Sequence, residues 1–76
     1  MRRRRPFVPQ PPALTPQEQQ VLHSIWEGHS ITQTADRFGV DLRTAESVRN
    51  ALKYKFGARN SVQLVRLALR YGMLKV

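Results

Sequence analysis

The chain has 76 residues, no cysteine and a formal net charge of +8, with 13 Lys and Arg against five Asp and Glu. This length allows one domain with a small core, and the lack of cysteine excludes disulfides and thiolate metal ligands. No apolar run reaches transmembrane length, and the basic start continues into proline instead of an apolar export segment. We therefore expect a cytoplasmic protein without metal, cofactor or membrane contact, which gains stability by oligomerisation.

Positive charge is concentrated near the two ends of the chain. Arg2 to Arg5 supply four positive charges, and the stretch after Glu46 has seven basic residues and no acid. Residues 6–40 contain a single basic residue, Arg37, against three acids. This distribution favours a nucleic-acid binder, although an anionic membrane surface or a cationic domain without a specific ligand fits it as well.

Residues 1–13 are expected to form a flexible, disordered arm rich in Arg and Pro. Positions 6, 9, 11 and 12 are proline, which excludes helix, and the successive arginines repel one another. Basic arms follow the phosphate backbone or enter a minor groove. The arm residues predicted to do so are Arg2, Arg3, Arg4 and Arg5. The alternative is a solvated tail that adds only long-range attraction.

Residues 14–76 are expected to form one all-α domain of four helices. Each predicted helix begins at a residue type that caps N-termini and ends at a glycine. The first two starts, Thr-Pro-Gln-Glu and Ser-Ile-Thr-Gln, also fit the capping box. The predicted helices lie between Thr15 and Gly28, Ser30 and Gly39, Asp41 and Gly57, and Asn60 or Ser61 and Gly72.

The second and third predicted helices are joined only by Gly39 and Val40, with Asp41 as the cap of the third. A short helix, a tight turn that contains glycine and a longer helix form a helix-turn-helix unit. Ala35 and Ala45 are small where the two helices must approach each other. An αα-hairpin without a ligand would show the same pattern, and it is the charge distribution that favours DNA binding.

The third predicted helix, about 42–56, has one apolar and one polar side. Its apolar side carries Ala45, Val48, Leu52 and Phe56. Its outward side carries Arg43, Glu46, Ser47, Asn50 and Tyr54, with Arg49 and Lys53 at the border. Asn can pair with adenine, Arg with guanine or phosphate, and Glu can accept from the cytosine amino group. The alternative for Glu46 is an ion pair with Arg43 or Arg49 in the same helix.

The fourth predicted helix has two apolar stripes, of which a peripheral helix needs one. Leu64, Leu67, Ala68 and Tyr71 form the first stripe, and Val62, Val65 and Leu69 form the second. An apolar surface of this kind favours a two-fold dimer contact, while the alternative is a helix sunk in the core. The predicted dimer residues are Val62, Val65, Arg66 and Leu69.

Four stretches together resemble the LuxR/GerE-type DNA-binding domain. They are LTPQEQQVL at 14–22, the Gly28 turn with Ser30, TADRFGVDLRTAESV, and KFGARNSVQLV at 55–65. The resemblance covers about residues 14–74 and implies a four-helix bacterial transcription-factor domain. In this family the third helix enters the major groove of double-stranded DNA and the fourth helix dimerises. With Met1 as the start, the resemblance implies a stand-alone, GerE-like regulator associated with the nucleoid. If the chain is a fragment, the N-terminal receiver or sensing domain of longer family members is missing from it.

The resemblance also implies roles for individual residues. The family's base-reading positions fall on Glu46, Ser47 and Asn50. Its phosphate-contacting positions fall near Thr44, Arg49, Lys53 and Lys55, to which the outward side of the helix adds Arg43. The family often has Lys or Arg at the position of Glu46 and His at that of Val48. Glu46 is therefore expected in the groove, where it selects a base or suppresses binding.

Two other classes of function compete with a DNA-binding regulator. Catalysis has little support, because His23 and His29 do not share a helical face and the chain has no glycine-rich phosphate loop or cysteine nucleophile. We therefore do not expect an enzyme. The rival is a protein-interaction module or antiactivator, which would heterodimerise with a related regulator or contact RNA polymerase and bind DNA only weakly.

Overall fold

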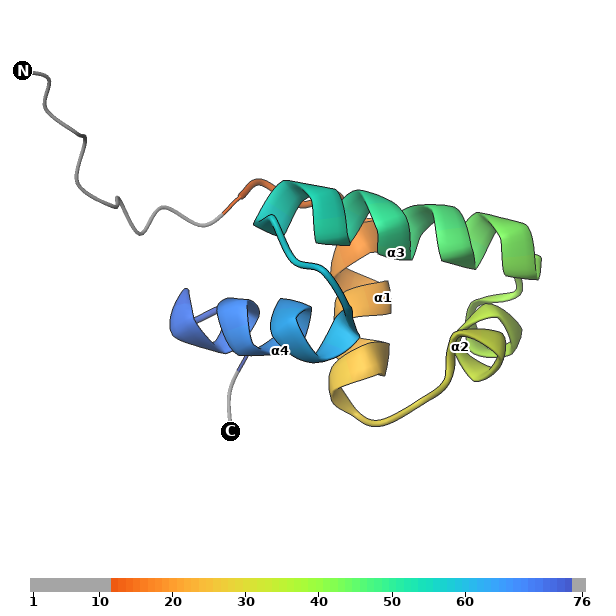
Figure 1. The fold of residues 1–76 in the computed structure, drawn as a ribbon. Helices are drawn as coiled ribbons and strands as arrows, with labels where there is room; N and C mark the ends of the chain where they lie inside the picture. Colours follow the sequence, from red (N-terminus) through yellow and green to blue (C-terminus); the bar gives the residue numbers. More distant parts are fainter. Residues whose placement is uncertain (1–11, 75–76) are drawn as a thin grey trace, which may run out of the picture.

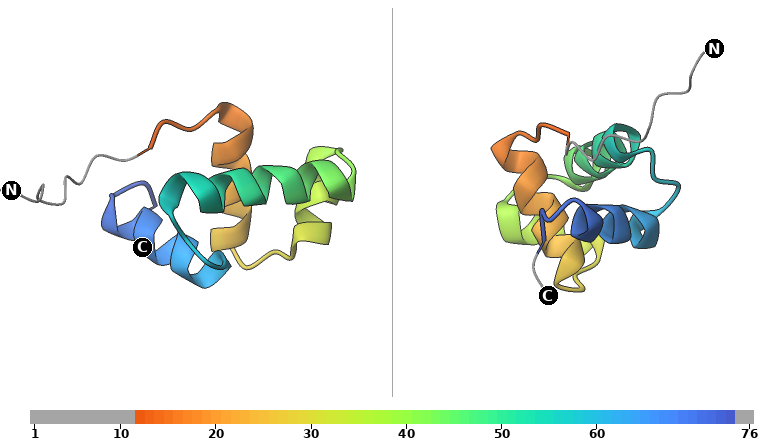
Figure 2. Two further views of the ribbon diagram at one scale, coloured as in Figure 1. Left: turned by 45° about the horizontal axis from the view of Figure 1, so that its top comes forward. Right: turned by 90° about the vertical axis from the view of Figure 1, so that its left-hand side faces the viewer.

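The computed structural model describes residues 12–74, and they form the predicted four-helix, all-α domain (Figure 1). The helices are α1 (Pro16–Trp26), α2 (Ile31–Phe38), α3 (Leu42–Phe56) and α4 (Ser61–Arg70). α3 packs against each of the other three helices and lies across α1, while α2 contacts its first half (Figures 1 and 2). Most of the predicted arm, including Arg2 to Arg5, lies outside the described residues.

Side-chain caps begin all four helices as the sequence predicts. In both capping boxes the hydrogen bonds are reciprocal, with Glu18 N–H donating to Thr15 Oγ1 at 3.1 Å and Gln33 N–H donating to Ser30 Oγ at 3.0 Å. Asn60, and not Ser61, caps α4, since its Oδ1 accepts from the backbone of the third helical residue at 2.8 Å.

Glycines in the left-handed region follow all four helices. Gly39 and Gly57 cap α2 and α3 directly, with φ of 67° and 68°. At α1 and α4 the cap is one residue earlier than the sequence suggests, and Gly28 and Gly72 come directly after it. A side chain at Gly39 would be strained by its positive φ, so this residue sets the sharp turn from α2 into α3.

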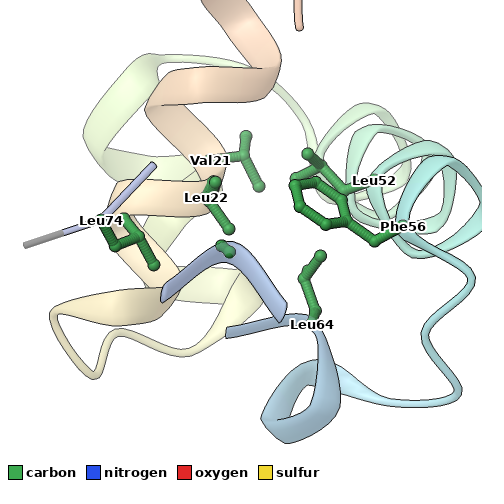
Figure 3. Close-up of a cluster of buried hydrophobic side chains, with 7 residues drawn as sticks. Val21, Leu22, Leu52, Phe56, Leu64 and Leu74 are labelled. Carbon is green, nitrogen blue, oxygen red and sulfur yellow. The ribbon is translucent and has the colours of Figure 1, made fainter. Parts of the chain in front are cut away.

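The apolar core lies between α1, α3 and α4 (Figure 3). It consists of Val21, Leu22, Leu52, Phe56, Leu64, Ala68 and Leu74, and Leu22, Leu52 and Leu64 are at most 1 % exposed. Val48, which the sequence places on the inner side of α3, is half-buried and packs against this cluster. The inner side of α3 is therefore fixed by the core, which determines the side that faces outward.

α2 is attached to the domain by small and polar groups. Ala35 and Ala45 are buried where α2 and α3 pack. The buried Ser24 and Thr34 hydroxyls are 2.7 Å apart, and Thr34 Oγ1 also donates to the carbonyl of Ser30 at 2.8 Å. Because the single Thr34 proton is used in that bond, Ser24 must be the donor in the other.

Candidate nucleic-acid interface

α3 is the longest helix of the described domain, with 15 residues, and its outward side is polar. Ala45 and Leu52 are fully buried on the inner side, whereas Arg43, Ser47 and Asn50 are exposed on the outside. Tyr54 is 87 % exposed at the end of the same side. Since successive turns bring these side chains into one row, they can contact one extended partner together.

The start of α3 is held by an ionised cap. Asp41 Oδ1 accepts a hydrogen bond from the backbone N–H of Thr44 at 2.7 Å. Hydrogen bonds from the Thr44 side chain and backbone hold the pKa of Asp41 below its usual value, so the carboxylate is charged at neutral pH. This negative charge also complements the positive end of the helix dipole. The cap therefore fixes the turn of α3 on which the first candidate contacts lie.

The border of this side carries half-buried charged and polar groups. These are Thr44, Glu46, Arg49 and Lys53. Within the described residues no salt bridge joins Glu46 to Arg43 or Arg49, which removes the ion-pair alternative in this conformation. Arg49 Nε is buried without a hydrogen-bond partner among the same residues. Both Glu46 and Arg49 thus retain unused hydrogen-bonding capacity.

Lys55 has a different environment from the other predicted phosphate contacts. Its ammonium group donates to Glu18 Oε1 at 2.7 Å and to the carbonyl oxygen of Ala13 at 3.0 Å. The Glu18 side chain is only 10 % exposed and also accepts from the N–H of Thr15. Nothing in the sequence indicates this pair, because its members are separated by 37 positions and meet only through the crossing of α1 and α3.

The Lys55 pair makes the stability of the domain depend on pH. The hydrogen bond from Lys55 is the main cause that holds the pKa of Glu18 below its ordinary value of 4.5. A lowered folded-state pKa contributes stability that is complete above the unfolded pKa and is lost as pH falls through the folded one. We expect the free energy of unfolding in urea to decrease as the pH falls below the ordinary Glu18 pKa of 4.5. Glu18→Gln, which keeps a capping-box residue, should flatten this decrease, and an unchanged pH profile would contradict the assignment.

α4 forms a second surface, which includes every predicted dimer residue. A groove of about 510 Å³ runs between α4 and the end of α1, and its lining residues are Ile25, Trp26, Ser61, Val62, Val65, Arg66 and Leu69. Leu64 and Ala68 are buried, while Val62 is 70 % exposed, so α4 is not sunk in the core. The sequence of α4 alone does not indicate that Ile25 and Trp26, at the end of α1, also line this groove.

Two negative findings concern the described residues. No helix among them has the length and apolar character needed to cross a membrane. Residues 12–74 also contain no group of three His, Cys, Asp or Glu side chains arranged to hold a metal ion.

The chain is similar in sequence to proteins of one known family. Residues 12–68 match the family model for bacterial regulatory proteins of the luxR family. The transcriptional regulatory protein MctR of Rhizobium johnstonii is 38 % identical over 61 residues, which cover 80 % of this chain and 28 % of MctR. This chain therefore spans little more than a quarter of that relative.

Solved structures contain a similar domain. The Vibrio cholerae VqmA dimer, a LuxR-type receptor studied in the absence of its target DNA, matches with a TM-score of 0.77 and 35 % identity over 79 % of this chain and 27 % of VqmA. VqmA in complex with a ligand and DNA matches with a TM-score of 0.76 and 28 % identity, over 99 % of this chain and 32 % of that one.

Proposed function

Because the chain belongs to the luxR family of bacterial regulatory proteins, we propose that it binds double-stranded DNA sequence-specifically as a dimer, with α3 in the major groove. The observation that carries the proposal is the position of α3, whose inner side is buried while Arg43, Ser47 and Asn50 remain exposed. An α-helix fits the major groove, where each base pair presents a distinct set of donors and acceptors. Such a regulator would act in the cytoplasm, on the nucleoid.

Glu46, Ser47 and Asn50 are the proposed base-reading residues. The Asn50 amide can form two hydrogen bonds with adenine, and the Ser47 hydroxyl can donate to or accept from several bases. Glu46 lies one turn before Asn50 and has no ion-pair partner among the described residues, so its carboxylate is available to a cytosine amino group.

Arg43, Thr44, Arg49 and Lys53 are the proposed phosphate contacts. Arg43 is exposed and the other three are half-buried along the border of the outward side. The unpaired Nε of Arg49 is a donor that a phosphate could satisfy if the side chain turns outward. We further propose that residues 1–13 act as an arm of domain 14–76, with Arg2 to Arg5 adding phosphate contacts.

The α4 groove is the proposed dimer contact. Val62, Val65, Arg66 and Leu69 lie along it, and contact with a second copy would remove the apolar side chains of Val62, Val65 and Leu69 from water. VqmA is described as a dimer, which supports a dimeric form of this chain. Two copies about a two-fold axis would place two α3 helices on successive turns of one DNA face.

One observation favours the second candidate, a module that heterodimerises with a related regulator. Arg66 and Arg70 are exposed on α4, and the helix Ser61–Arg70 contains no acid to match them in a symmetric pair. A partner helix with acidic residues would complement these charges better than a second copy. At physiological salt the repulsion between exposed like charges is largely screened, so this observation does not exclude the homodimer.

Binding selection over randomised duplex DNA tests the proposed function and the role of Glu46 together. The wild type should enrich a two-fold symmetric motif, and Glu46→Gln should relax the preference at one position in each half-site, losing about 1–3 kcal/mol of discrimination. The affinity of Glu46→Gln for DNA should equal or exceed that of the wild type, because the variant lacks a carboxylate that phosphates repel.

Two results of this selection would contradict the base-reading role of Glu46. If Glu46→Gln leaves every position unchanged, the carboxylate reads no base. If the wild type enriches no sequence but Glu46→Lys does, the carboxylate suppresses DNA binding, and the heterodimer candidate is favoured.

A further inference from the structure

The ammonium group of Lys55 joins the last turn of α3 to the residues that precede α1. One of its bonds reaches Glu18 at 2.7 Å, and another reaches the main-chain carbonyl of Ala13 at 3.0 Å. The first described residues accordingly pass the C-terminal end of α3 (Figures 1 and 2). The chain therefore enters the domain at one end of the helix whose outward side carries the candidate DNA contacts.

These bonds make Lys55 better suited to holding the chain than to binding phosphate. Its positive charge is balanced by the carboxylate of Glu18, and two of its three N–H donors are occupied. Glu18 is itself fixed, because its side chain is nearly buried and accepts from the N–H of Thr15 at 2.9 Å. Ala13 is thus tied to a rigid ion pair by a charge-assisted hydrogen bond.

The length of the arm makes its point of departure important. Arg5 precedes Ala13 by eight residues, so covalent geometry allows it to reach at most about 29 Å from the tied carbonyl. α3 has 15 residues and is about 22 Å long, a similar distance. The end of α3 at which the arm begins therefore decides which phosphates Arg2 to Arg5 can contact.

We propose that Lys55 is a positioning residue, which fixes the start of the arm beside the C-terminal end of α3 so that Arg2 to Arg5 reach the DNA bound by that helix. The inference rests on the proposed DNA-binding function. It assigns Lys55 a role different from the direct phosphate contact that the family resemblance implies.

A double-mutant cycle tests this role with full-length variants. Glu18→Gln/Lys55→Met removes both charges together, so that no carboxylate is left unpaired, and the glutamine retains the capping box. A second variant replaces Arg2 to Arg5 by glutamine and keeps the length of the arm. Affinity for a mixed-sequence duplex of about three helical turns is measured for the wild type, both variants and their combination.

The expected result is coupling between the two changes. Glu18→Gln/Lys55→Met should weaken binding at least about threefold when the arginines are present, and less than about 1.5-fold when they have been replaced. A direct phosphate contact or a general loss of structure would give equal losses in both backgrounds, and equal losses would overturn the proposal. No loss in either background would overturn it as well.

A second readout does not depend on DNA. Because the chain has no cysteine, Gln10→Cys provides a single attachment point for a spin label. In the otherwise unaltered chain, the spin label should broaden mainly the amide signals of the last turn of α3. With Glu18→Gln/Lys55→Met, this broadening should become weaker and spread over more residues. Identical broadening patterns would overturn the anchor. If the wild type bound no duplex at all, the proposed function would fail while this measurement still decided the anchor.

Discussion

Asn50→Ala is expected to weaken binding to the selected DNA sequence by about 10- to 100-fold. The exposed Asn50 amide lies on the outward side of α3, where it can form two hydrogen bonds with one adenine. Binding to unrelated duplexes depends mainly on phosphate contacts, so it should change by less than about twofold. Gln20→Ala is the matched control, because it removes an exposed amide from α1 and should leave both affinities unchanged.

Fluorescence anisotropy with the selected and an unrelated duplex measures the two affinities. Equal losses on both duplexes would show that Asn50 contributes to general attraction or to folding rather than to sequence reading. No loss on either duplex would remove Asn50 from the interface.

Val62→Glu is expected to separate the dimer into folded monomers and to weaken operator binding by about 100-fold. Val62 is 70 % exposed in the α4 groove, so the charge hardly disturbs the monomer but would be buried in the pair. Each monomer would then bind a half-site without the gain from linking two sites, which commonly reaches 100-fold or more.

Gln63→Glu is a close control for this change. It adds the same charge to the first turn of α4, at an exposed position that is absent from the groove lining. Sedimentation on a duplex that carries a single half-site should show two copies of Gln63→Glu and one copy of Val62→Glu. A wild type that remains monomeric on DNA at saturating concentration would contradict the proposed homodimer.

Much of the fold can be predicted from the sequence because its signals are local. The capping boxes at Thr15 and Ser30 and the left-handed turns at Gly39 and Gly57 depend on residues within one helical turn. The same holds for the outward direction of Ser47 and Asn50, since the spacing of Ala45 and Leu52 defines the buried side of α3.

The features that escaped prediction depend on packing between distant segments. Lys55 donates a hydrogen bond to Ala13, and Trp26 lines the α4 groove, only because α1 crosses the other helices. The sequence does not indicate that the buried hydroxyls of Ser24 and Thr34 pair, because this contact joins α1 to α2. The helical pattern places Glu46 on the outward side, whereas α3 leaves it half-buried at the border.

We propose that the outward side of α3 is the DNA-reading surface. Amide chemical shifts of the 76-residue chain, followed while the selected duplex is added, test this claim most directly. We expect the largest changes around Ser47, Asn50 and Tyr54, with small changes at the exposed positions of α1. Changes concentrated on α4, or a spectrum that the duplex leaves unaltered, would contradict it.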